Sequence, residues 1–261
     1  MDAIIATEFL RRTGELVISQ LVGRTELPRH VFKLTHLTSL VITHTDVTTI
    51  PDEISKLTGL NQLCIISVGN ISHIPDCVST LTDLRRLNIS YNDTRKYPPL
   101  ENLTKLQTLC INNTLATHVP ADIAALRNLN RLEMGGKMDR YLDICLDKSS
   151  PLTTLTNLIE LRITCATFRD FPDGVGEYPF LTTLAISYTN LTDIPVFCNR
   201  LCLSYNMIEC CRKIDKAPAA LYLSGNPLKH IDFSAFECGI LDIPDGVTTT
   251  IEFDSPQLIP F

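Results

Sequence analysis

PDEISKLTGLNQLCI, from Pro51 to Ile65, is the stretch that decides the fold. From Ile54 to Leu63 its apolar residues recur at every third position, which is typical of a helical or 3₁₀ turn. From Leu63 to Ile65 they recur at every second position, which is typical of a short strand. A proline has a preset φ and no N–H to lose, so it suits the start of the first segment. The stretch therefore predicts an outer turn followed by a strand.

The same unit recurs along the chain, with a proline at its start. PADIAALRNLNRLEM, from Pro120 to Met134, has its apolar residues at the same positions. The steps between successive prolines are 23, 24, 23, 22, 52 and 23 residues, for Pro28, Pro51, Pro75, Pro98, Pro120, Pro172 and Pro195. Because 52 is twice 23 plus 6, we expect one repeat to lack its proline and to carry an insertion, which we place within 135–151. A fixed period of this length predicts a solenoid of stacked units.

Within each unit the residues follow the pattern L-x-x-L-x-L-x-x-N. LRRLNISYN, from Leu84 to Asn92, is a complete copy, and other copies carry Thr45 or Thr189 in the asparagine position. In these residues the chain resembles the leucine-rich repeat family, and its 23-residue form with a proline is similar to the intracellular class of Ras-suppressor-like and Scribble-like proteins. The resemblance covers nearly all of 13–254. It implies an α/β solenoid, a horseshoe with a parallel β-sheet on the concave face and short helical, 3₁₀ or extended segments on the convex face.

The repeats are expected to fill the chain as a single domain, 1–261, of roughly eleven turns. We expect an N-terminal cap at 1–12, repeats at 13–254 and a C-terminal tail at 255–261, because the open ends of a repeat stack need atypical cover. The sheet is predicted to end near 250–253. Toward that end the units shorten to 17 and 20 residues, which predicts less material on the convex side.

The asparagine position varies from repeat to repeat. Asn92, Asn206 and Asn226 are expected to bond to neighbouring backbone groups as a buried ladder. Val68 and Ala166 cannot make such bonds, so we expect a looser turn or ordered water at those two positions.

Composition excludes several functions. A net charge of −6 argues against a general role in binding nucleic acid or anionic membranes, and no apolar run approaches the 18 or more residues of a membrane span. The first residues lack the basic start and apolar stretch of a signal peptide, and most of the ten cysteines fall on the repeat pattern, so we expect reduced thiols and a cytoplasmic protein. An extracellular alternative with disulfides and glycans stays open, because there are Asn-x-Ser/Thr sites at Asn70, Asn88, Asn92, Asn102, Asn112 and Asn190.

Side chains alternate along a strand, so the residues between the buried leucines predict the concave surface. The central column is Val17, Val41, Cys64, Asn88, Cys110, Glu133, Arg162, Ala185, Cys202, Tyr222 and Glu252. The neighbouring column is Glu15, Ser39, Gln62, Arg86, Thr108, Arg131, Glu160, Thr183, Arg200, Ala220 and Thr250.

Charges gather in the middle of this surface. We hypothesise that a patch there docks a protein partner, since arginine pairs with carboxylates and stacks on rings; its residues are Arg86, Asn88, Arg131, Glu133, Glu160 and Arg162. The alternative is a solvated surface on which the charges only pair with one another. The insertion is a second candidate for partner contact, with Tyr141 and Arg140 as possible anchors, although a neutral loop is an equal alternative.

The sequence has no Gly-rich phosphate loop, no His-Glu-x-x-His and no Gly-x-Ser-x-Gly, so no catalytic activity is expected. The cysteines at 198, 202, 210 and 211 lack the paired spacing of a zinc site, so no metal and no cofactor are expected. The main hypothesis is a non-enzymatic, monomeric module in signalling, scaffolding or host targeting that binds a protein partner, with no nucleic acid, membrane insertion or small-molecule substrate. The rivals are an extracellular recognition domain and the substrate-recognition part of a ubiquitin-ligase-like effector.

Overall fold

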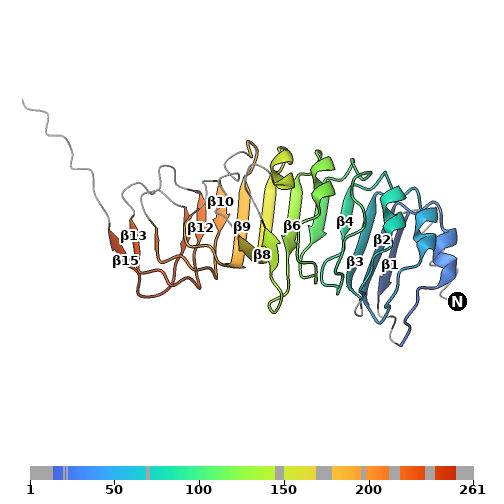
Figure 1. Ribbon diagram of the computed structural model, residues 1–261, viewed down its shortest axis with the longest axis horizontal. Coiled ribbons are helices and arrows are strands. Elements are labelled where there is room, and N and C mark those ends of the chain that lie inside the picture. The colour runs from blue at the N-terminus through green and yellow to red at the C-terminus, as the bar shows by residue number, and fades with distance from the viewer. Residues whose placement is uncertain are drawn as a thin grey trace, which may run out of the picture.

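One short parallel strand from each repeat builds the main sheet of an elongated, gently curved stack (Figure 1). The computed structural model describes residues 14–19, 21, 23–68, 71–144, 150–168, 178–194, 198–211, 218–232 and 239–250. In this part of the chain eleven strands follow one another along the sheet, which agrees with the predicted number of turns. They are β1 (Glu15–Ser19), β2 (Ser39–Thr45), β3 (Gln62–Val68), β4 (Arg86–Asn88), β5 (Thr108–Ile111), β6 (Arg131–Gly135), β8 (Glu160–Phe168), β9 (Thr183–Thr189), β10 (Arg200–Cys202), β12 (Ala220–Tyr222) and β14 (Ile240–Asp242).

The register of the sheet confirms both predicted columns from β1 to β12. Val17 lies opposite Val41, and the pairing continues repeat by repeat to Tyr222. The last member of each column was wrong, because Tyr222 pairs with Asp242 and Ala220 pairs with Ile240. Thr250 belongs instead to a second sheet, and Glu252 lies outside the described residues.

In the described part of the chain, five 3₁₀ helices cover the other side of the longer repeats. Pro28, Pro51, Pro75 and Pro120 each stand immediately before one, as the repeat pattern predicts, whereas no helix begins directly after Pro98. The helices are η1 (Arg29–Lys33), η2 (Asp52–Lys56), η3 (Asp76–Thr80), η4 (Ala121–Ala125) and η5 (Pro151–Thr154). The coiled ribbons run along one side of the stack from blue to yellow (Figure 1). Pro172 and Pro195 lie outside the described residues.

The repeat that was expected to lack its proline has one, displaced by one position. Ser150 occupies the place of the earlier prolines and accepts a hydrogen bond from the N–H of Leu152 at 3.3 Å, while Pro151 follows as the first helical residue. A serine cap and a proline at the first helical position are both favourable at a helix start, so the repeat still begins its outer turn there.

A second sheet of three parallel strands accompanies the short C-terminal repeats. Its strands are β11 (Cys210–Cys211), β13 (His230–Asp232) and β15 (Thr248–Thr250), in that order. Each lies in the segment that follows a strand of the main sheet, where the longer repeats carry a 3₁₀ helix. The steps from Leu201 to Leu221 and from Leu221 to Leu241 are 20 residues each, which shortens this segment, and an extended strand spans the same length with fewer residues than a helical turn.

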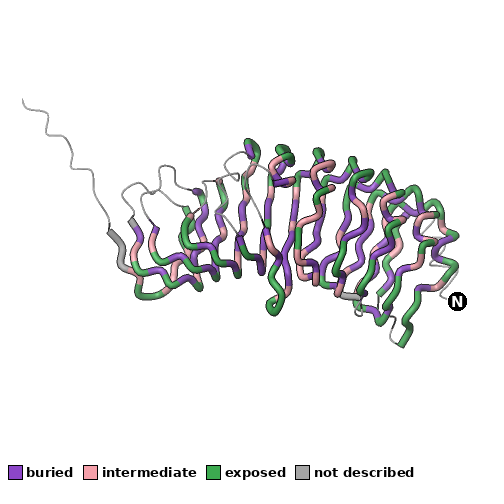
Figure 2. The backbone as a smooth tube through the Cα atoms, viewed as in Figure 1, coloured by how far each residue is buried: buried purple, intermediate pink, exposed green. Residues whose placement is uncertain are grey.

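The core runs through the stack between these two sides, and Figure 2 shows the buried residues recurring in every turn. Leu109 and Leu132 are completely buried, as core residues shared between neighbouring repeats should be. Within the described residues, no helix has the length and apolar character needed to cross a bilayer. The predicted cap at 1–12 and tail at 255–261 lie outside the described residues.

The asparagine ladder forms as predicted. Asn206 donates to the carbonyls of Ile186 at 2.7 Å and Leu203 at 2.8 Å, and its oxygen accepts from the backbone and hydroxyl of Thr189. Asn226 repeats the arrangement one turn later, donating to Leu203 and Leu223 at 2.8 and 2.7 Å. Buried backbone groups that would otherwise lack partners are satisfied in this way.

The expectation of a looser turn at Val68 and Ala166 was wrong. Both residues belong to extended strands, Val68 opposite Thr45 and Ala166 opposite Thr189. Without an asparagine to turn the chain, β3 and β8 continue past the usual end of the strand and satisfy their backbone groups by pairing.

Candidate functional site

Four charged side chains from β6 and β8 meet at the centre of the concave face. Arg131 lies opposite Glu160 and Glu133 lies opposite Arg162 in the sheet register. Arg131 binds Glu133, and it binds Glu160 through Nη1 at 2.9 Å; Arg162 binds Glu160, and its Nε lies 3.6 Å from Glu133. The four ion pairs form a closed ring with no net charge, which we call the charge ring.

The carboxylates of the charge ring lie deeper than the guanidinium groups. The side chains of Glu133 and Glu160 are 18% and 19% exposed, whereas those of Arg131 and Arg162 are 42% and 48% exposed. Burial alone would lower the pKa of Arg131, but the hydrogen bond and charge of Glu133, with the charge of Glu160, raise it. The ring therefore exposes two permanently charged, half-buried guanidinium groups on the concave face.

Of the other predicted site residues, Arg86 and Asn88 lie on β4, apart from the charge ring. Strand β5 separates them from β6, so Thr108 and Cys110 stand between the two groups. Arg86 is exposed, and the side-chain oxygen of Asn88 accepts the backbone N–H of Ser90 at 3.0 Å. The predicted patch is thus one compact cluster on β6 and β8 and a separate polar pair on β4, with β5 between them.

The insertion is a hairpin that leaves the sheet and returns to it. Strand β6 pairs with the first half of β8, and β7 (Leu142–Ile144) pairs with the second half of the same strand. Between them the turn is closed by Lys137 and Arg140, which exchange backbone hydrogen bonds of 2.9 Å in both directions. From Leu132 to Leu161 the step is 29 residues, six more than the usual 23, so the prediction of about six extra residues agrees with the register.

Two glycines make the hairpin possible. A Cβ on Gly135 would lie 1.9 Å from the carbonyl oxygen of Thr164, and one on Gly136 would lie 2.1 Å from that of Arg140. Lys137 forms an ion pair with Asp93, which ties the hairpin to the loop after β4. Tyr141 is 40% exposed and follows the turn, so it lies outside the two concave columns rather than within the charge ring.

A row of residues in left-handed backbone conformation was missed by sequence reasoning. These residues occupy one position of the repeat, just before the asparagine position, and are His44, Tyr91, Asn113, Cys165, Tyr188 and Tyr205. The rings of Tyr188 and Tyr205 are stacked, with centroids 4.6 Å apart and planes 4° from parallel. Gly225 follows in the row, and a Cβ there would lie 2.4 Å from the ring of Tyr205. The signal in the sequence was tyrosine recurring before Asn92, Thr189 and Asn206.

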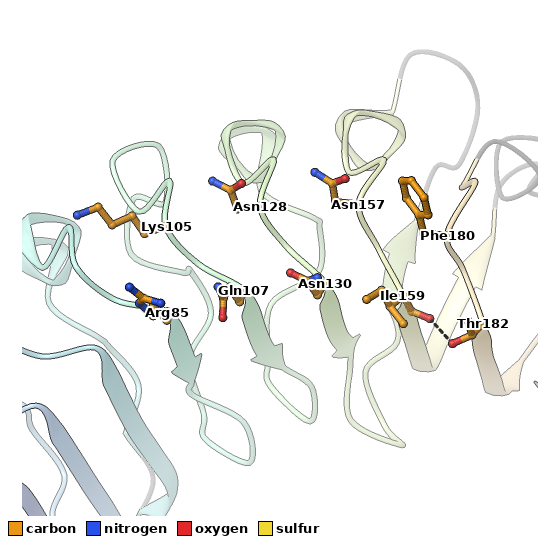
Figure 3. Close-up of a pocket in the computed structure, with 9 residues that line it drawn as sticks. All are labelled: Arg85, Lys105, Gln107, Asn128, Asn130, Asn157, Ile159, Phe180 and Thr182. Carbon is orange, nitrogen blue, oxygen red and sulfur yellow. Dashed lines mark hydrogen bonds between the residues drawn. The ribbon is translucent and has the colours of Figure 1, made fainter.

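A groove of about 600 Å³ runs along one rim of the sheet (Figure 3). We call it the rim groove. Its first row consists of the residues that immediately precede five successive strands, Arg85, Gln107, Asn130, Ile159 and Thr182. Its second row consists of the residues two positions earlier in four of these repeats, Lys105, Asn128, Asn157 and Phe180.

The cysteines and the Asn-x-Ser/Thr sites bear on the extracellular alternative, which would have disulfides and glycans. Within the described residues, eight cysteines are free thiols and no group of three His, Cys, Asp or Glu side chains is arranged to hold a metal ion. Burial raises the pKa of Cys110 to about 12, with the charge of Glu133 and a hydrogen bond to it acting in the same direction. Among the glycosylation sites, Asn92 is buried and belongs to the ladder, Asn102 and Asn190 are exposed, and Asn70 lies outside the described residues.

Solved structures with the same architecture are numerous, although the sequence matches no protein-family model. An internalin of Listeria monocytogenes is 20% identical, with a TM-score of 0.70, over 94% of this chain and 70% of that one. A leucine-rich-repeat protein of Leptospira interrogans is 22% identical, with a TM-score of 0.65, over 78% and 53%. The leucine-rich-repeat ectodomain of the plant receptor kinase GASSHO1/SCHENGEN3 from Arabidopsis thaliana, solved in complex with CASPARIAN STRIP INTEGRITY FACTOR 2, is 20% identical, with a TM-score of 0.58, over 89% and 33%.

These likenesses establish the fold. The chain is a leucine-rich-repeat solenoid with an open parallel sheet, as its repeat pattern predicts. It spans about half the length of the Leptospira protein and a third of the plant ectodomain. At this level of identity the finer class, the 23-residue intracellular form, stays a prediction.

Proposed function

We propose that this protein is a non-enzymatic recognition module that binds a protein partner through its concave face. The observation that carries the proposal is the charge ring, which places two half-exposed arginines at the middle of a broad sheet surface. Arginine is a frequent anchor of protein interfaces because its planar fork pairs with carboxylates and stacks on rings. Arg86 and Asn88 extend this surface along β4, and Tyr141 would contribute from the insertion hairpin.

Because the charge ring has no net charge, we expect it to recognise the positions of a partner's charged groups rather than the partner's total charge. The ring's two glutamates hold the arginines in place, so a partner meets donors whose orientation is already set. Ordering a side chain before binding reduces the entropy lost on association. A partner with one acidic group for each arginine would form new ion pairs with the two guanidinium groups. These pairs would replace bound water and the weak, exposed ion pairs of the ring.

A charge-swapped variant tests this proposal without dismantling the ring. It carries Arg131→Glu, Glu133→Arg, Glu160→Arg and Arg162→Glu, so every ion pair keeps opposite signs and the net charge is unchanged. The intact chain is used as bait in lysate of its source cell, and bound proteins are identified by mass spectrometry. A specific partner is expected on the native chain and is expected to be lost, by at least ten-fold, on the swapped one.

The matched control reverses charge on the convex side, at Arg29 and Lys33 of η1, both of which are exposed. Arg29→Glu with Lys33→Glu should leave the same partner bound. Equal retention by the native, swapped and control baits would remove the charge ring from the interface and leave the concave assignment without support.

The cytoplasmic location, the likeness to the intracellular 23-residue class and a role in signalling, scaffolding or host targeting are parts of this proposal. The cysteines support the cytoplasmic location, because Cys64 and Cys110 are buried between neighbouring strands as packed residues of the sheet. Counting thiols on the unfolded, unreduced protein separates this from the extracellular alternative. Ten free thiols agree with the proposal, whereas missing thiols or attached glycans favour a secreted recognition domain.

A further inference from the structure

The rim groove has a different chemistry at each end. Ile159 and Phe180 come from neighbouring repeats, and their side chains are 43% and 60% exposed. A single exposed apolar residue is ordinary on a protein surface, but two side by side in a groove give an apolar partner group a place to be buried. Figure 3 shows both at the same end of the two rows.

The opposite end of the groove has one positive charge in excess. Arg85 and Lys105 supply two cations, and Asp83 supplies one carboxylate, whose Oδ1 lies 2.6 Å from Lys105. Both members of that pair are more than half exposed, so the interaction is weak and screened by salt. A single carboxylate from a partner would balance this end.

Between the two ends the groove is lined by amides. Asn128 donates to the carbonyl of Thr104 and Asn157 to that of Arg127, both at 2.8 Å. These bonds fix the two side chains and leave an oxygen and a second N–H on each. Gln107 and Asn130 face them from the first row with exposed side chains. Such groups can both donate to and accept from the peptide groups of an extended chain.

The main chain of the rim is already satisfied. The carbonyl of Gln107 accepts two N–H groups from the next repeat, at 2.9 and 3.0 Å, and Arg85 and Asn130 accept pairs in the same way. A partner therefore cannot add to the sheet at this rim, and it must be recognised by side chains. With a single excess cation beside an acidic residue in a chain of net charge −6, the groove is unsuited to the backbone of a nucleic acid.

We propose that the rim groove binds an extended segment of a partner protein, with an acidic side chain at the Arg85 end and a large apolar side chain at the Phe180 end. From β4 to β9 the groove crosses four strand spacings, about 19 Å, which an extended chain covers in about six residues. The surface is distinct from the charge ring, so this inference goes beyond the proposed function and does not depend on it.

The test is selection of a displayed library of random linear peptides on the native chain. The enriched peptides are expected to share an acidic residue about five positions from a large apolar one, and free peptides carrying that pattern are expected to bind at least ten-fold more weakly to Phe180→Ser. On Arg85→Glu, a repeat selection should enrich a basic residue in place of the acidic one. This exchange of sign is a result that a merely structural effect of the substitution would not produce.

Two controls keep the outcomes separate. The double variant Arg29→Glu with Met207→Ser changes an exposed cation and an exposed apolar residue away from the groove, and it should bind the selected peptides as the native chain does. The charge-swapped variant should also bind them, because the charge ring lies on the concave face. If the selected peptides fail to bind the charge-swapped variant but still bind Phe180→Ser, their binding site is on the concave face, and the assignment to the rim groove is overturned. A selection that enriches no shared pattern would overturn the proposal as well.

Discussion

The long repeats and the short C-terminal repeats use the same leucines but close their outer sides differently. Between Leu16 and Leu87 the steps are 24, 23 and 24 residues, and the outer segments form 3₁₀ turns whose apolar residues complete the core. From Leu184 to Leu241 the steps are 17, 20 and 20, and in the 20-residue repeats the outer segments are strands joined by backbone bonds, with the neighbouring Lys229 N–H donating to the carbonyl of Glu209 at 2.8 Å.

The comparison teaches that the outer segment, not the core strand, decides how neighbouring repeats hold together. In the long half, cohesion on the outer side comes from side chains such as Ile54 and Leu57, which are completely buried. In the short half it comes from the backbone ladder between the outer strands, while buried asparagines join successive turns in both halves, Asn92 in the long half and Asn206 and Asn226 in the short half. The first depends on packed volume and the second on hydrogen bonds, so the two halves should respond to different substitutions.

The largest effect is expected from a cavity in the long half. Leu132→Ala should cost about 2–5 kcal/mol of unfolding free energy, because a completely buried side chain is lost from the core bounded by η4 and η5. Leu221→Ala, the matched change in the short half, should cost less, since the outer backbone ladder survives it. Urea unfolding followed by circular dichroism gives both values. A larger loss of unfolding free energy for Leu221→Ala than for Leu132→Ala would contradict this difference between the long half and the short half.

The short half should in turn be the more sensitive to loss of its ladder. Asn206→Ala leaves the carbonyl of Ile186 and the N–H of Thr189 without this partner and removes one of the two amide donors to the carbonyl of Leu203, the other being Asn226, at a cost of about 2–4 kcal/mol. Thr45→Ala, the equivalent position in the long half, removes one bond of 3.4 Å and should cost less than about 1 kcal/mol. Similar losses for the two variants, in the same urea experiment, would show that the asparagine position matters equally throughout.

Sequence reasoning reached the register of the sheet because the alternation of Leu87, Asn88 and Ile89, and its copies, fixes which residues face the core. It failed at the C-terminal end, where Leu241-Asp242-Ile243 and Ile251-Glu252-Phe253 both alternate, and the second of these was taken as the last strand of the sheet. It named the members of the charge ring and offered their pairing across adjacent strands as an alternative, but it did not foresee the pairs within a strand, Arg131 with Glu133 and Arg162 with Glu160, which depend on rotamers. The rim groove could not be predicted from the sequence, because its residues lie just before the strands and form rows only when the repeats stack.

Raising the pH should weaken both halves through one buried thiol in each. Burial raises the pKa of Cys110, on the concave face, and of Cys211, in the second sheet, to about 12, from an ordinary value of 9.0. A raised pKa in the folded state means that the stabilisation is complete below pH 9 and is lost as the pH rises toward 12, since the unfolded chain releases its proton first. Between pH 8 and 10.5 each thiol should contribute a loss of about 2 kcal/mol.

The control for this effect is alanine at each thiol. Cys110→Ala and Cys211→Ala should each flatten part of the decline in urea stability between pH 8 and 10.5, and the double variant should flatten more of it. Iodoacetamide at pH 8 gives an independent measure, because a protonated thiol reacts slowly: both cysteines should be modified much more slowly in the folded protein than in urea. A decline that is unchanged in the double variant would assign the pH dependence to other groups.

The smallest effect is expected from the charge ring, which sits in the long half where packing already provides cohesion. The charge-swapped variant retains all four pairs, and exposed or half-exposed pairs contribute little, so its unfolding free energy should differ from the native value by less than about 1 kcal/mol. Urea unfolding at low salt and at 1 M sodium chloride measures this, and the difference should shrink further at high salt. A loss comparable to that of Leu132→Ala would make the ring a structural element of the long half. A small loss leaves its two arginines available for recognition, which is what the proposed interface requires.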